Sequence, residues 1–149
     1  MSNSRAVKFI LTACYTLTAC FTALAVFLIA PYLETRYWPV VGKMKIEWMT
    51  AEEGNENQTR IHASFTKIRN CDYIGIAWFR GNRVTGFIRV PLQLMRMPND
   101  VSSPNRPLGY QQSGPWIVDI PQGEIEKNSF VELYHQCTPL WVSRTEFYP

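Results

Sequence analysis

The chain of 149 residues contains only two histidines, His62 and His135, and only four cysteines. A protein-bound zinc ion needs three or four ligands, so this scarcity argues against a metal centre. His135 and Cys137 would lie on one face of a strand, but no third ligand stands at a fixed spacing from them. We therefore expect no metal ion, and we predict no other cofactor.

Sequence signatures of catalysis are lacking as well. No serine stands in a G-x-S-x-G elbow, and no glycine-rich loop has the form that cradles phosphate. A hydrolase would require His62, His135 and an acidic residue to converge from distant positions, and it remains the third interpretation. We predict that the protein is not an enzyme, and we assign no catalytic residue.

A large excess of one charge is also absent. From Glu34 onward the chain holds thirteen basic and twelve acidic residues, whereas a nucleic-acid binder presents a strongly basic face. We therefore expect no nucleic-acid partner. Six of the basic residues nevertheless lie from Lys67 to Arg96, where Asp72 is the only acidic residue. This segment predicts either a patch for an anionic partner, such as lipid headgroups or an envelope polymer, or a solubilising outer face.

What the chain does contain is a run of 25 uncharged residues from Phe9 to Leu33. A membrane core of about 30 Å needs only about 20 apolar residues in a helix, so the run predicts one transmembrane helix over residues 9–33. Membrane lipid is then one partner of the chain. Tyr32, Tyr37 and Trp38 suit the membrane–water interface at the end of this helix. Small residues along the run are compatible with association into homo- or hetero-oligomers.

The ends of the run indicate an orientation. Arg5 and Lys8 favour a cytoplasmic tail over residues 1–8, followed by a linker over 34–42 and a periplasmic or extracellular domain over 43–149. Two processed forms compete with this retained anchor. Ala23-Leu24-Ala25 resembles a signal-peptide cleavage site, and the residues before Cys20 resemble a lipoprotein signal. The apolar run continues beyond both sites, which favours the uncleaved anchor.

Cys71 and Cys137 are the only cysteines outside the run. An even pair beside predicted strands, on the outer side of a membrane, is usually a disulfide, and we predict that these two are bonded. Two buried free thiols in a cytoplasmic domain are the alternative. Closing a loop of this length stabilises a domain by about 4 kcal/mol through the unfolded chain.

Alternating polar and apolar residues predict an all-β domain after the run. Residues 51–58 and 97–115 are expected to be loops, the latter because it holds four prolines, and Gly81-Asn82 is expected to be a hairpin turn. No segment after residue 34 has a helical period. We expect strands over 43–49, 61–66, 72–79, 83–90, 116–120, 129–137 and 140–148.

Short strands at this spacing, with a cysteine, then Trp78, then a late cysteine, give a pattern that resembles the immunoglobulin-like domains. The resemblance implies a single antiparallel β-sandwich over roughly residues 43–148. Two details depart from it: Trp78 follows Cys71 by only seven residues, and His135 stands where the tyrosine corner would be.

These features predict a single-pass, membrane-anchored binding module displayed on the outer side of a membrane, with an unknown protein or envelope polymer as partner. An accessory subunit of a larger membrane complex is the second interpretation. The candidate contact residues come from the predicted basic hairpin and from the proline-rich loop with its edge: Arg80, Arg83, Arg89, Tyr110 and Trp116.

Overall fold

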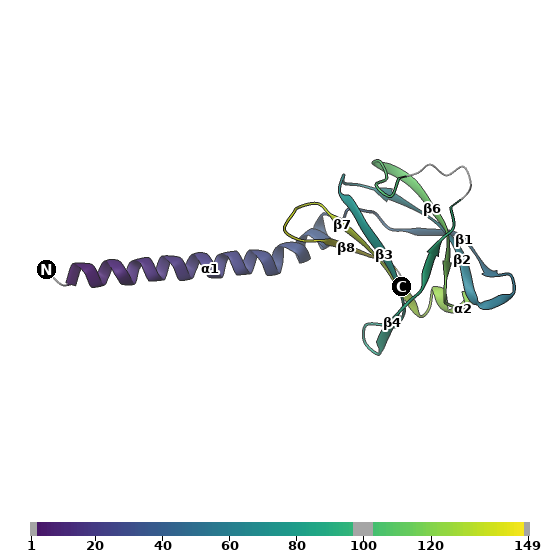
Figure 1. Ribbon diagram of the computed structural model, residues 1–149, viewed down its shortest axis with the longest axis horizontal. Helices are drawn as coiled ribbons and strands as arrows, with labels where there is room; N and C mark the ends of the chain where they lie inside the picture. Colours follow the sequence, from purple (N-terminus) through teal and green to yellow (C-terminus); the bar gives the residue numbers. More distant parts are fainter. Residues whose placement is uncertain (1–2, 97–102, 148–149) are drawn as a thin grey trace.

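The computed structural model describes residues 3–96 and 103–147, and it shows one long helix projecting from a β domain (Figure 1). Helix α1, Asn3–Tyr37, has 35 residues and is therefore about 52 Å long. It is long and apolar enough to cross a membrane, and Thr12, Thr18 and Thr22 each donate a hydrogen bond to a main-chain carbonyl one turn back. The helix ends at Tyr37 and so extends past its predicted end at Leu33.

The β domain consists of two four-stranded sheets in which every neighbouring pair is antiparallel. One sheet has the order β1-β2-β6-β5 and the other β4-β3-β7-β8. The strands are β1 Lys45–Glu52, β2 Asn55–Lys67, β3 Asp72–Asn82, β4 Gly86–Val90, β5 Leu92–Leu94, β6 Gly109–Val118, β7 Ser129–Gln136 and β8 Ser143–Phe147. This arrangement confirms a β-sandwich-like domain behind an apolar N-terminal helix.

The core is formed by inward residues of both sheets. Ile61 on β2 and Val118 on β6 pack with Trp78 on β3 and Val131 on β7, and all four are at most 1% exposed. The buried indole N–H of Trp78 donates to the Ser129 hydroxyl at 2.9 Å, so the ring is buried without an unsatisfied donor. A four-residue helix that the sequence did not predict, α2 Gln122–Ile125, contributes Ile125 to the same core.

The predicted disulfide is present between Cys71 and Cys137, 66 residues apart. The two cysteines flank the paired residues Asp72 and Gln136, so the bond joins the ends of the neighbouring strands β3 and β7 within one sheet. The other two cysteines lie in α1 as free thiols. No disulfide therefore crosses from one sheet to the other.

Two predicted turns are wrong. Residues 51–58 are not a loop, because β1 and β2 form a hairpin that turns at Glu53-Gly54. The second hairpin turns after Asn82 rather than at Gly81-Asn82, since β3 extends through Asn82 and pairs with Gly86. The Asn82 side-chain oxygen accepts hydrogen bonds from the main-chain N–H groups of Val84 and Thr85, which closes the turn.

The expected proline-rich loop is also partly a strand. Residues 97–102 lie outside the described part, but β6 begins at Gly109 and contains Pro115. Its ladder with β2 shifts register between Ile61 and Ala63, so the proline falls at an irregularity where its missing N–H matters least. Gly114 has φ +110°, and a side chain there would come within 2.7 Å of the Ile61 carbonyl oxygen. The short strand β5 was likewise not predicted.

Candidate functional site

A cavity of about 460 Å³ lies between the two sheets, lined by residues of six strands, β2 to β7. The strands alternate their side chains across each sheet, so the inward positions of both sheets converge on one space. The lining is completed by residues outside the strands: Val41, Met44, Pro91, Arg96, Ser103, Pro104 and Arg106.

Most of the cavity wall is apolar. The indole N–H of Trp116 is satisfied by the Ser113 hydroxyl at 3.0 Å, so the ring acts as a hydrophobic surface. The apolar side chains on the wall come from both sheets: Phe65, Ile76, Leu92, Leu94, Trp116 and Leu133. A wall of this composition favours burial of an apolar group.

Two buried ionisable side chains from opposite sheets also line the cavity. Lys67 on β2 is 3% exposed, and its ammonium group donates to the Cys71 carbonyl at 3.1 Å. Burial lowers the pKa of Lys67, while the nearby carboxylate of Asp72 opposes that shift. His135 on β7 is 4% exposed, and its Nδ1 has no hydrogen-bond partner among the described residues.

The environment of His135 keeps its ring neutral. Burial lowers the pKa of His135 to about 4, and the positive charge of Lys67 acts in the same direction. The ring of Tyr73 meets it edge-on, with centroids 5.8 Å apart, and burial raises the pKa of the Tyr73 phenol. A neutral imidazole has one donor and one acceptor nitrogen, so the buried Nδ1 of His135 is a polar atom whose hydrogen-bonding capacity is unused among the described residues.

The remaining charged lining is cationic. Three arginines join Lys67 around the cavity: Arg89, Arg96 and Arg106. No aspartate or glutamate is among the described residues that line it. Arg89 and Arg96 have solvent-exposed side chains, whereas Arg106 is half-buried. A concave site with low-dielectric walls and charges of one sign concentrates its field, which here favours an anion.

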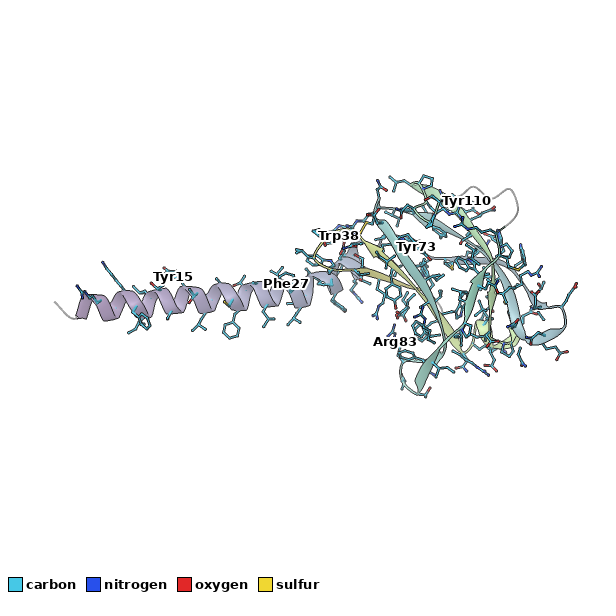
Figure 2. The ribbon with its side chains drawn as sticks, in the orientation of Figure 1. Tyr15, Phe27, Trp38, Tyr73, Arg83 and Tyr110 are labelled. Carbon is cyan, nitrogen blue, oxygen red and sulfur yellow. A yellow bond between two sulfur atoms is a disulfide. The ribbon has the colours of Figure 1, made fainter. Side chains whose placement is uncertain are left out.

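The structure divides the five contact residues that the sequence suggested. Arg89 and Trp116 line the cavity together. Arg80 is in a two-pronged pair with Glu124, at 2.7 and 2.8 Å. Tyr110 is 63% exposed, and Figure 2 places it at the opposite end of the β domain from Arg83.

Arg83 has a structural environment of its own. Its guanidinium pairs with Glu146 at 2.6 Å and with Glu132, a carboxylate that is only 4% exposed. The Tyr134 hydroxyl donates to the same Glu132 side chain. Arg83 is therefore the main counter-charge of a buried acid.

The two histidines are not brought together. His62 stacks on Trp48 with ring centroids 5.5 Å apart, and it is not among the residues that line the cavity. Within the described residues no group of three histidine, cysteine or acidic side chains could hold a metal ion. Lys67 and Arg106 are cavity residues that sequence reasoning did not single out as contacts, although Lys67 belonged to the basic segment.

Comparison with known proteins adds no relative. No protein-family model, no curated protein and no solved structure matches this chain.

Proposed function

We propose that this protein is a single-pass, membrane-anchored and non-enzymatic binding module, and that its ligand occupies the cavity between the two sheets. The cavity is the observation that carries the proposal. Ligand sites are concave, mostly apolar and fitted with a few convergent polar groups, within about 300–1,000 Å³. The volume of about 460 Å³, the apolar wall and the polar side chains of Lys67 and His135 in the lining meet each of these conditions.

The ligand chemistry follows from the lining. The apolar wall favours a hydrocarbon group, and the arginines favour a carboxylate or phosphate at the solvent-exposed side. Guanidinium groups bind both anions through two parallel hydrogen bonds. We infer that the ligand is an anionic amphiphile with one short acyl or alkyl chain, and that the imidazole of His135 hydrogen-bonds to a polar group of it.

Location is the second part of the proposal. The apolar surface of α1 is exposed along its length, which supports a membrane-spanning segment, and the basic residues Arg5 and Lys8 favour residues 1–8 in the cytoplasm. The Cys71–Cys137 disulfide supports a periplasmic or extracellular β domain, because such bonds persist in oxidising compartments. Intact mass of the purified chain distinguishes this anchor from cleavage after Ala25 or lipidation at Cys20.

We also infer that the sandwich has immunoglobulin-like connectivity. Its two sheet orders correspond to strands A-B-E-D on one sheet and C-F-G, extended by one more strand beside C, on the other. Trp78 on the third strand is buried in the core, which also supports the assignment. The disulfide differs, since it joins the third and seventh strands within one sheet instead of linking the two sheets.

Calorimetric titration of the full chain in lipid nanodiscs tests the ligand site. We expect octyl phosphate to give a saturable one-to-one isotherm after subtraction of empty nanodiscs, and octanol to bind more weakly. Arg89→Ala should weaken octyl phosphate binding about tenfold, the effect of losing one charge-assisted hydrogen bond. Lys127→Ala, which removes an exposed cation that does not line the cavity, should have no effect.

A variant that fills the cavity provides the converse test. Leu92→Trp places a larger side chain on the half-buried strand β5 and should abolish binding of both probes. Unchanged binding in this variant, or no saturable heat with the wild type, would contradict the cavity as the site. A stoichiometric protein partner that co-purifies in mild detergent, without probe binding, would support the accessory-subunit interpretation instead.

A further inference from the structure

The loop between β7 and β8 turns back along α1 (Figure 1). The ring of Trp141 in this loop meets the ring of Phe27 at right angles, with centroids 6.4 Å apart. Phe27 belongs to the uncharged run of residues 9–33. The loop therefore contacts the part of the helix that the sequence assigns to the membrane.

A buried carboxylate fixes this contact. Glu34 on α1 is 8% exposed, accepts hydrogen bonds from the Trp141 indole and the Ser143 hydroxyl, and pairs with Arg69 at 2.7 Å. Phe27 and Glu34 are seven residues apart, so they lie on nearly the same face of α1 and about 10 Å apart along its axis. Trp141 bridges both, which holds the loop in place along the helix.

The same loop exposes apolar side chains beside the helix. Leu140 is 60% exposed and Val142 is 44% exposed, and at the end of α1 Trp38 is 64% exposed. A core of about 30 Å that begins at Phe9 would end about 20 residues later, near Leu28. Trp141, packed against Phe27, would then lie at the boundary between hydrocarbon and headgroups, where tryptophan is enriched.

We propose that Leu140, Trp141 and Val142 form a lipid-contacting loop that inserts into the interfacial layer of the membrane anchored by α1. The proposal rests on the membrane anchor proposed above. The partner is the bilayer itself, because the apolar patch is continuous with the apolar surface of α1. With α1 and the loop as two attachment points joined through Glu34, the β domain is held at a fixed angle to the membrane.

Depth-dependent quenching in nanodiscs tests the proposal with the full chain. Alanine at both free helix cysteines leaves the disulfide intact and allows an environment-sensitive NBD label on one introduced cysteine. The labelled variants are Leu140→Cys in the loop, Leu17→Cys in the middle of α1, and Val84→Cys as the matched control. Val84 is 94% exposed in the β3–β4 turn, which Figure 1 shows away from α1.

We expect blue-shifted emission for the labels at positions 140 and 17, and neither a shift nor quenching at position 84. The label at position 140 should be quenched most by the shallow 5-doxyl phosphatidylcholine, and the label at position 17 by the deeper 12-doxyl phosphatidylcholine. If position 140 behaves like position 84 while position 17 is quenched, the loop proposal is overturned and the anchor stands. If position 17 is not quenched, the anchor itself fails and the loop proposal fails with it.

Discussion

Acidification should destabilise the β domain through His135. The folded state keeps this imidazole neutral because burial lowers its pKa to about 4, whereas the unfolded chain binds the proton with a pKa near 6.5. The unfolded state therefore binds more protons between these values, and the free energy of unfolding falls as the pH falls. At about 1.4 kcal/mol per pKa unit, protonation of His135 lowers the free energy of unfolding, relative to neutral pH, by about 2 kcal/mol at pH 5 and by about 3 kcal/mol at pH 4.

Urea unfolding of the full chain in detergent micelles, followed by tryptophan fluorescence, measures this dependence. His135→Leu removes the titrating group and retains an apolar side chain, while Lys67 on β2 and Tyr73 on β3 still face the position. The other titratable groups contribute equally to the pH dependence of wild type and variant, so the difference between the two pH profiles isolates His135. Equal losses of stability between pH 7 and pH 5 would refute the buried, neutral imidazole.

Three further changes test the β domain by the same unfolding assay. Gly81→Ala should cost at least about 2 kcal/mol more than Gly86→Ala, because both glycines have positive φ but only the first would drive a side-chain carbon into the main-chain oxygen of Gly86. Equal effects would contradict the close approach. Replacing both Cys71 and Cys137 with alanine should cost about 4 kcal/mol, from the 66-residue separation. Arg83→Ala should cost about 2 kcal/mol, since it leaves a buried carboxylate with a weaker partner.

The long helix and most strands were predictable from the sequence because they depend on local patterns of polar and apolar residues. The apolar run determines α1, and the alternation of polar and apolar residues identifies most of the strands. The disulfide was predictable from the even pair of cysteines outside the apolar run, together with the expected location of the domain outside the cytoplasm. The end of α1 was not predictable, because in the sequence the charge of Glu34 marks the end of the apolar run. Only the tertiary contacts show that this carboxylate is buried against Trp141.

The cavity was not predictable, because it depends on pairing between distant segments. Arg89 and Arg83 are six residues apart, which suggested one basic face on a common strand. In the fold Arg83 lies in the turn between β3 and β4, where Glu132 and Glu146 from other strands neutralise it. Arg89 lies on β4 beside the cavity. The sequence shows that both residues are cationic, but the partners of each arginine depend on the register of the sheet.

The residues that join β2 to β3 show why the basic segment is not a single surface. Lys67 lines the cavity, and its ammonium group contacts the Cys71 carbonyl beside the disulfide. Two positions after Lys67, Arg69 pairs with Glu34 at the end of α1, and its main-chain N–H contacts Val40 after the helix. Within five residues the chain therefore reaches the cavity, the junction with α1 and the disulfide. Each cation from Lys67 to Arg83 has a different structural partner, so charge alone does not mark a binding face.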